Sequence, residues 1–297
     1  MPLPRTPPLD SFGLDADRLE PTRPGDDESV GNGNWHLWTR GGEHLILRRY
    51  HLLHTEVDLR FERAVLDHLD ARGWCVPGVV AGPVRYEERL WAVTRFVPGQ
   101  PHRDETVAQQ HERGAILARL HADLRSLDLD AGTRPGFFPA ADLDAMGEFQ
   151  GWDRGIELLA AQRPDLAERS VRAMAYAKEL VVEHALLDLP RTVVHGDFAS
   201  WNLHFDETGR FAGVIDFDLC HPDSRAWELV IARVDRAPEL VAGYQAATVN
   251  PLTEHELAAI EPLQVVLRVL MVMAELWTAQ QSGTFNEPMI VRQLDRT

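Results

Sequence analysis

The sequence predicts an α+β fold of two parts, a small β-rich lobe followed by a larger, mainly helical lobe. The chain of 297 residues is longer than a typical single domain and can bury a sizeable core. Up to Pro98 the apolar residues occur in short runs that glycine, proline and charged residues interrupt, which is typical of strands. Beyond Gly99 they recur every three or four positions, which is typical of helices. We therefore expect a flexible leader over 1–25, a first lobe over 26–98 and a second lobe over 99–297.

Two hairpins and one helix account for the first lobe. The runs on either side of the glycine turn at 41–42 predict one hairpin, and those on either side of the charged turn at 87–88 predict the other. Between them, the apolar residues from 59 to 69 are spaced for a helix that ends at Gly73. The lobe is therefore expected to consist of strands around one helix.

The second lobe is expected to be a series of helices. The leucines at 117–127 share one helical face, and the segment 140–187 reads as several helices divided at Gly151 and Pro164. A last long helix is expected over 253–281. Its most apolar part is interrupted by charged residues and is shorter than the roughly 20 residues that a membrane-spanning helix needs, so we expect no membrane span.

Charge and composition limit the partners. Hydrophobic residues make up 44% and charged residues 26% of the chain, as in globular proteins, and the net charge is −16. Such a field repels nucleic acid and anionic membranes and attracts cationic small molecules, although surface acids can also serve solubility alone. The proline-rich start lacks the apolar core of a secretory signal, which favours a cytoplasmic protein. The two cysteines, Cys75 and Cys220, have no metal-ligand spacing and favour neither a disulfide nor a zinc site.

One pair of segments carries the chemistry. The first, "VVHGDFASWNLHF", contains Asp197 and Asn202, and the second, "GVIDFDLCHPDSRAWELV", contains Asp216 at the end of a predicted hairpin. Phosphoryl transfer from a nucleotide needs an acid to orient or deprotonate the attacking hydroxyl, and oxygen ligands for divalent metal ions. Asp and Asn also stabilise ordinary turns, so the first segment alone would not decide between the two readings. The second segment at this separation favours the catalytic one.

These two segments resemble those of the aminoglycoside phosphotransferase and choline kinase family, small-molecule relatives of the protein kinases. The resemblance extends in element order over the chain after the leader, and it implies a two-lobed protein-kinase-like fold. It implies that Asp197 is the catalytic acid or base and that Asn202 and Asp216 hold Mg²⁺ against the phosphates of ATP. Asp218 is expected to help at the metal or the substrate.

Two neighbours of the catalytic acid are also placed by the resemblance. His195 is expected to be a packed structural residue rather than an acid or base. Glu228, in "AWEL", stands where the family usually has an Asp that bonds the backbone of the catalytic loop from a helix. This departure lengthens the side chain and leaves its role open.

The nucleotide is expected to bind in the first lobe. The loop "SVGNGNWHLW", with Gly31 and Gly33, could cover the phosphates through backbone N–H groups, although a plain turn fits almost as well. Lys178 is the only lysine and lies outside this lobe, so an arginine must supply the phosphate-binding cation. We assign that role to Arg48, with Arg49 on the opposite face of the strand.

Two further nucleotide contacts are expected in this lobe. Glu62 is the expected partner of Arg48, the alternative being a solvated charge paired with a neighbouring arginine. Backbone groups from Arg95 to Val97 are expected to bond the adenine edge.

The segment 133–165 is the candidate wall for the acceptor. Acids and aromatics alternate there, which suits a cationic, ring-bearing ligand, but an amphipathic helical insert would look the same. The leading hypothesis is an ATP- and Mg²⁺-dependent kinase of a hydroxyl on an aminoglycoside or another amine-bearing antibiotic, a resistance enzyme. The alternatives are a metabolite kinase of choline, homoserine or sugar type, and a nucleotide-binding protein that has lost catalysis.

Overall fold

The computed structural model describes residues 9–22, 32–102, 105–127, 134, 137–232, 237 and 239–297. The chain folds into two units, each of which uses two separate stretches of sequence. Unit 1 comprises Met1–Asp104 and Ser200–Leu219, and unit 2 comprises Glu105–Ala199 and Cys220–Thr297. The segment 193–205 is therefore divided, because Asp197 belongs to unit 2 and Asn202 to unit 1.

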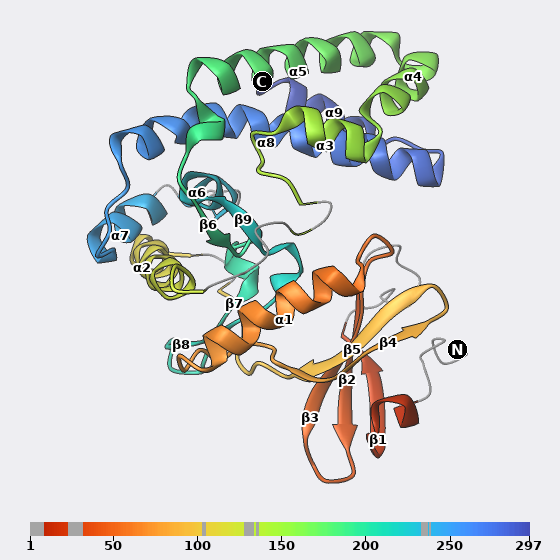
Figure 1. Ribbon diagram of the computed structural model, residues 1–297, viewed down its shortest axis with the longest axis vertical. Helices are drawn as coiled ribbons and strands as arrows, with labels where there is room; N and C mark the ends of the chain where they lie inside the picture. Colours follow the sequence, from red (N-terminus) through yellow and green to blue (C-terminus); the bar gives the residue numbers. More distant parts are fainter. Residues whose placement is uncertain are drawn as a thin grey trace. The chain divides into compact units, whose positions relative to one another are not determined.

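Unit 1 is built on an antiparallel sheet of five strands in the order β1-β2-β3-β5-β4 (Figure 1). The strands are β1 (Ala16–Pro21), β2 (Gly33–Thr39), β3 (His44–Arg49), β4 (Val79–Tyr86) and β5 (Arg89–Arg95). Both predicted hairpins are present. The turn between β4 and β5 has positive φ at Glu87 and Glu88, which gives it the twist that a two-residue hairpin prefers.

Part of the predicted leader is structured. Leu9–Phe12 forms a 3₁₀ turn, and β1 pairs with β2, with Leu19 opposite Leu37. Phe12 is buried in the core of the sheet. The expectation of a flexible leader over 1–25 is therefore wrong for residues 9–22. The prolines in this part of the sequence argue against a strand. Proline is nevertheless tolerated at the ends and edges of sheets, which is where β1 lies.

The two faces of the sheet have different roles. One face of β2 and β3 carries a core cluster that includes Trp35, Leu37, Leu45 and Leu47. The alternating residues of the same strands point to the other face, because successive side chains of a strand alternate. Helix α1 (Glu56–Asp70) begins with a capping box at Thr55 and contributes Leu59 to a second cluster.

Unit 1 contains a third hairpin in addition to the two described above. Strands β7 (Leu203–Phe205) and β8 (Phe211–Val214) pair, and the 3₁₀ turns Ser200–Asn202 and Phe217–Leu219 flank them. Gln100 and Phe205 exchange N–H···O bonds of 3.0 and 2.9 Å. Gly99 adopts φ +100°, and a Cβ there would lie 2.6 Å from the Phe205 carbonyl oxygen. The expected boundaries at 98 and 99 are therefore displaced, because 99–104 and 200–219 belong to unit 1.

Unit 2 is mainly helical, with one small sheet of β6 (Arg191–Val194) and β9 (His221–Ser224). Its helices are α2 (Val107–Leu124), α3 (Leu143–Gln150), α4 (Trp152–Gln162), α5 (Pro164–Glu183), α6 (Arg225–Ala232), α7 (Leu240–Ala247), α8 (Glu254–Ser282) and α9 (Glu287–Leu294), with a 3₁₀ turn at Leu186–Asp188. The predicted breaks at Gly151 and Pro164 are present. The α+β fold class is thus confirmed.

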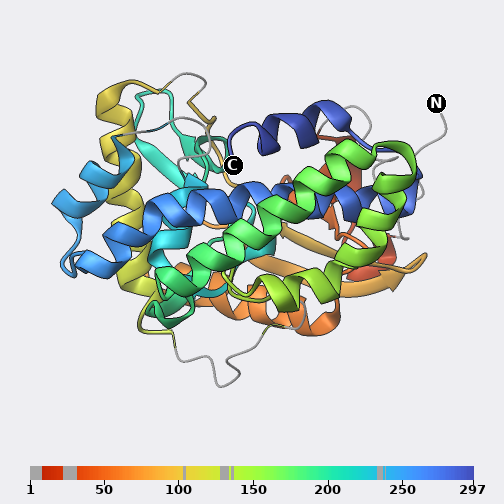
Figure 2. The ribbon, with the colours of Figure 1, turned by 90° about the horizontal axis from the view of Figure 1, so that it is seen from above.

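Helix α8 is the longest element of unit 2. In Figure 2 it runs beside α5, and its residues Val272 and Leu276 share a core cluster with Leu159 of α4 and Leu166 of α5. Among the described residues it is the one helix long and apolar enough to cross a membrane, and 44% of its most apolar window is buried. The core contacts made by α8 agree with its reading as a core helix.

Candidate active site

A cavity of about 540 Å³ lies within unit 1, on the face of the sheet opposite the Trp35 cluster. Strands β2, β3 and β5, the segment after β5 and the β7–β8 region line it. The lining includes the residues that the sequence assigns to a nucleotide and a metal, namely Arg48, Arg95, Val97, Asn202 and Asp216. Five of the predicted site residues are therefore brought together.

Arg48 is held by carboxylates in this cavity. Its Nη2 atom lies 2.6 Å from Oδ1 of Asp216 and 3.3 Å from Oδ2 of Asp218, and the residue is only 7% exposed. Burial on its own lowers the pKa of Arg48, but the charges of Asp216, Asp218 and Glu62 outweigh it and raise the pKa well above its usual value. The Arg48 guanidinium is therefore a permanent cation at the cavity wall.

Glu62 takes part in the same charge cluster. It is 2% exposed, and its charge is among those that raise the pKa of Arg48. The alternative of a solvated helix charge is therefore wrong. Arg49 lies on the other face of β3, as expected, with its guanidinium 5.5 Å from the ring centre of Trp35. Alternation along the strand thus separates two adjacent arginines into different environments.

Asp218 is a buried carboxyl group. Asn32 donates a hydrogen bond to Asp218 and, through Oδ1, accepts one of 2.7 Å from the N–H of His51. Burial first, and then the charge of Asp216, raise the pKa of Asp218 to about 8, although Arg48 opposes this. Asn32 was not singled out from the sequence, because its partner lies 186 positions away.

Of the residues predicted to contact the phosphates or the adenine, Gly33, Arg95 and Val97 lie within the described part of the chain. Gly31 lies outside the described residues, whereas Gly33 is the buried first residue of β2 and pairs with Arg49. The N–H of Arg95 donates to the Gly78 carbonyl at 2.9 Å, and the Val97 carbonyl lies 3.0 Å from Nδ1 of His204. The roles of Gly33, Arg95 and Val97 toward a nucleotide stay predictions.

The predicted metal ligands suit magnesium chemically. Asn202 and Asp216 line the same cavity and offer amide and carboxylate oxygens, which are the donors that Mg²⁺ prefers. The backbone connects them, since the N–H of Ile215 donates to the Asn202 carbonyl at 2.9 Å. Asp216 adopts φ +69°, a left-handed conformation that Asp tolerates better than most residues. The structure therefore fixes the backbone at both ligands.

The loop that carries Asp197, the predicted catalytic residue, follows β6 in unit 2. His195 is fully buried, and its Nδ1 atom accepts a hydrogen bond of 3.2 Å from the N–H of Asp197. The Asp197 carbonyl accepts from the N–H of Ala199 at 2.9 Å. The ring of His195 is thus used to hold the loop, in agreement with its predicted structural role, while the carboxyl-bearing side chain of Asp197 is half-buried.

Glu228 anchors this loop from helix α6. Its carboxylate accepts a hydrogen bond from the N–H of His195 and bonds of 3.2 Å to both oxygens from the N–H of Gly196. Burial of the fully enclosed side chain works against its charge. The nearby His121 imidazole, with Nε2 at 3.9 Å, the charge of His195 and the Gly196 N–H nevertheless lower the pKa of Glu228. The longer side chain therefore performs the backbone contact that the sequence left open.

Arg113 is a second anchor that the sequence analysis missed. It is fully buried, its Nη2 atom lies 2.7 Å from Oε2 of Glu105, and its Nη1 atom donates to the carbonyls of Phe198 at 3.4 Å and Ala232 at 2.6 Å. Phe198 follows Asp197 directly. An arginine on an amphipathic helix reads as a surface charge in the sequence, so no local pattern could have revealed this contact.

Glu228→Gln is expected to lower kcat by about tenfold to a hundredfold and stability by about 1–3 kcal/mol, because an uncharged amide satisfies the two N–H donors less well. Kinetics and denaturant unfolding would measure both. The control is Glu157→Gln, the same change on an exposed residue of α4. Equal behaviour of the two variants would contradict the anchoring role.

The acid-rich segment 133–165 follows the amphipathic reading in part, since most of its acids are exposed but Phe149 is exposed as well. Asp142 caps α3 by accepting from the N–H of Ala145 at 3.2 Å, and Asp144 pairs with Lys178 at 2.5 Å. Trp152 packs against the core cluster of α4, α5 and α8. Asp142, Asp144 and Trp152 therefore have structural roles, and these roles explain their presence without an acceptor.

Comparisons with known proteins identify the family of this chain. Residues 26–260 match the phosphotransferase enzyme family, APH. The homoserine kinase of Phenylobacterium zucineum is 31% identical over an alignment of 286 residues, which covers 88% of this chain and 82% of that protein. The homoserine kinase of Granulibacter bethesdensis is 29% identical over 253 residues, 80% of this chain and 74% of that one.

A solved structure shares the fold. The structure of an amicoumacin kinase in complex with AMP-PNP, Ca²⁺ and Ami has a TM-score of 0.69 to this chain, with 14% identity over 96% of this chain and 91% of that one. This confirms the kinase-like fold that the two motif segments predicted. The family match covers most of the sequence, including both units. The chain therefore belongs to the phosphotransferase enzyme family.

Proposed function

We propose that this chain is an ATP- and Mg²⁺-dependent kinase that phosphorylates the hydroxyl of a small amine-bearing metabolite, with homoserine as the first candidate. The observation that carries the proposal is the cavity of unit 1, where Arg48, Asn202 and Asp216 meet. These side chains supply a cation for phosphates and oxygen ligands for a metal. The anchored loop that presents Asp197 provides the acid that such a reaction also needs.

The nucleotide would lie against the sheet in this cavity. Ile46 and Thr94 offer a wall for the adenine, whose edge would meet backbone groups between Arg95 and Val97. Gly31 and Gly33 would supply backbone N–H groups near the phosphates. Arg48 can bind a phosphate through two N–H groups once its contacts with the carboxylates rearrange.

Asn202 and Asp216 would hold the magnesium ion. Among the described residues, no group of three or more His, Cys, Asp or Glu side chains is placed to hold a metal. Protein and nucleotide would therefore share the ligands, as is usual for Mg²⁺ in kinases. When bound, the ion neutralises charge that develops on the transferred phosphoryl group. Glu62 and Asp218 would keep Arg48 in place.

Asp197 would act on the acceptor. Its carboxylate would accept the proton of the attacking hydroxyl as the oxygen bonds to phosphorus and the bond to the leaving ADP oxygen breaks. Glu228 and Arg113 fix the backbone on both sides of Asp197, so the carboxylate needs little reorganisation. These two are positioning residues.

The relatives favour a metabolite over an antibiotic. The sequence analysis placed amine-bearing antibiotics first, on the acids of 133–165, but Asp142 and Asp144 have structural partners. Relatives that match over most of their length include homoserine kinases. An amine remains part of the proposed acceptor, and a cytoplasmic location would suit a metabolic kinase. The non-catalytic alternative is less favoured because Asp197, Asn202 and Asp216 are all present.

The test is ADP release with ATP and Mg²⁺ across homoserine, choline, small amino alcohols, sugars and aminoglycosides. We expect release that depends on homoserine and is lost in Asp197→Asn. Release with an aminoglycoside and not with homoserine would restore the antibiotic reading. Binding of ATP without release for any acceptor would contradict the kinase proposal for this set of compounds.

A further inference from the structure

A second cavity, of about 370 Å³, lies entirely within unit 2. It is bounded by the end of α2, the start of β6 and the segment that follows α7. The described residues that line it include three arginines and a histidine, and no aspartate or glutamate. In a chain with 46 acids against 30 lysines and arginines, such a lining is unusual and favours an anionic ligand.

The three arginines of this cavity differ in their exposure to solvent. Arg125 and Arg191 are exposed, and within the described part of the chain neither side chain has an ion pair. Arg225 is buried, and Glu256 binds it through bonds of 2.9 and 2.7 Å, so this pair is close to neutral. The net positive charge of the cavity therefore comes from Arg125 and Arg191.

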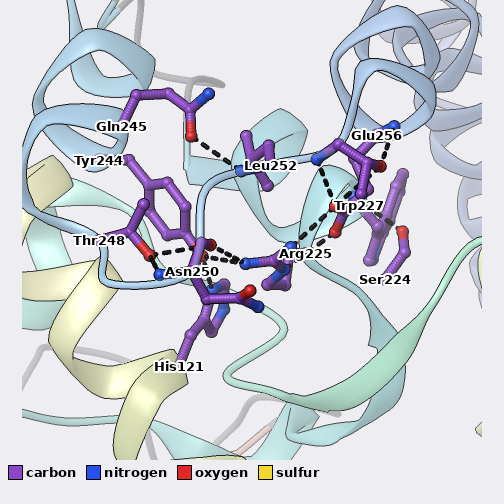
Figure 3. Close-up of polar contacts among 11 residues, drawn as sticks. His121, Ser224, Arg225, Trp227, Tyr244, Gln245, Thr248, Asn250, Leu252 and Glu256 are labelled. Atoms are coloured by element: carbon purple, nitrogen blue, oxygen red, sulfur yellow. Dashed lines mark hydrogen bonds and ion pairs between the residues drawn. The ribbon is translucent and has the colours of Figure 1, made fainter.

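The inner wall is a polar network (Figure 3). Arg225 donates through Nη1 to the Asn250 carbonyl at 2.7 Å, and the same atom lies 3.5 Å from the Tyr244 hydroxyl. That hydroxyl lies 3.0 Å from Nδ1 of His121. Burial raises the pKa of Tyr244, although Arg225 opposes it, so the phenol stays protonated within this network. The wall thus offers hydrogen-bonding groups beside the two free cations.

The same histidine connects the cavity to the catalytic loop. Nδ1 of His121 meets Tyr244, and Nε2 lies 3.9 Å from Oε2 of Glu228. Glu228 in turn accepts from the N–H groups of His195 and Gly196. His121 is 3% exposed, so its ring has little freedom to move independently of these neighbours. A ligand that shifts the buried Tyr244–His121 pair, by way of its neighbour Arg225, would therefore act on the anchor of the loop.

We propose that this cavity binds a small oxyanion, a phosphate- or carboxylate-bearing metabolite, and that the bound anion tightens the catalytic loop through His121 and Glu228. Arg125 and Arg191 would supply the charge, and the polar groups of Thr192 and Asn250 would orient the anion. Binding does not depend on the proposed function, whereas the regulatory effect rests on it.

The binding test uses inorganic phosphate as the probe. Calorimetric titration is carried out in the presence of AMP-PNP and Mg²⁺, which occupy the nucleotide cavity. We expect a Kd in the millimolar range or below for the wild type, and binding weakened by roughly tenfold or more in Arg125→Gln/Arg191→Gln. The matched control, Arg60→Gln/Arg154→Gln, removes two exposed arginines outside the cavity and should bind like the wild type. Succinate in place of phosphate separates carboxylate from phosphate recognition.

The coupling test follows hydrogen exchange in the peptide 193–205. Phosphate should slow exchange of the His195 and Gly196 amides by about threefold or more in the wild type and not in the cavity variant. Equal phosphate binding by all three proteins, or none by the wild type, would overturn the site. Binding without a change in exchange would overturn the coupling. Neither readout uses turnover, so failure here is distinct from failure of the proposed kinase reaction.

Discussion

Asp197→Asn is expected to lower kcat by about 10²–10⁴-fold, because asparagine cannot accept the proton of the attacking hydroxyl. The change preserves size, and the backbone N–H that donates to His195 is unaffected. The affinity for ATP should therefore stay within about twofold of the wild type, as nucleotide and metal are assigned to residues of unit 1. Steady-state kinetics with the acceptor, together with calorimetric titration of AMP-PNP, would measure the two effects separately.

The matched control is Asp153→Asn, the same change on an exposed residue of α4 in unit 2. It should retain wild-type kcat and KM. If Asp197→Asn kept most of the activity, the result would contradict the assignment of Asp197 as the catalytic base, even if the protein proved to be a kinase. If both kcat and nucleotide binding were lost, misfolding would have to be tested by circular dichroism before any role is assigned.

Arg48→Met should have the second large effect, on binding and on stability together. The loss of the guanidinium removes the cation predicted to bind phosphate, which also forms ion pairs with Asp216 and Asp218, while Glu62 remains buried nearby. We expect the Kd for ATP to rise about 10–100-fold and the free energy of unfolding to fall by about 2–4 kcal/mol. The lower end of the range in unfolding free energy reflects solvent screening, because the side chain of Asp216 is 38% exposed. Titration calorimetry and urea unfolding would measure the two losses.

Two variants serve as comparisons for this prediction. Arg48→Lys keeps the charge but loses the two-pronged donor, so it should restore most of the stability and part of the affinity. Arg49→Met removes the neighbouring arginine, which lies over Trp35 on the opposite face, and should leave ATP binding unchanged. A Kd for ATP that is the same in Arg48→Met and in the wild type would contradict the assigned role.

The sequence predicted those features that depend on local order. Both hairpins, the breaks at Gly151 and Pro164, and the separation of Arg48 from Arg49 follow from turn chemistry and from the alternation of strands. The motif that joins Asp197 to Asn202 was recognisable because its residues are close in the chain. The roles of these residues toward ligands stay predictions.

Features that depend on distant partners could not be predicted. Asn32 meets Asp218, and Arg113 meets Phe198, across 186 and 85 positions of sequence. Asn32 and Arg113 each make a structural contact in the fold. The spacing of residues along the chain does not identify the distant partner of a polar side chain. Strand β1 was missed for a related reason, since its pairing with β2 outweighs the prolines around it.

The presence of arginine rather than lysine at position 48 also determines how the protein responds to reagents that acylate amines. Reagents that acylate amines beside a bound nucleotide need a neutral lysine amine, and a guanidinium with a raised pKa offers no such nucleophile. The single lysine, Lys178, lies in unit 2 and is paired with Asp144. Amine-directed labels would therefore modify this protein at Lys178 and not in the cavity that Arg48 lines, so affinity profiling based on lysine acylation would overlook that cavity.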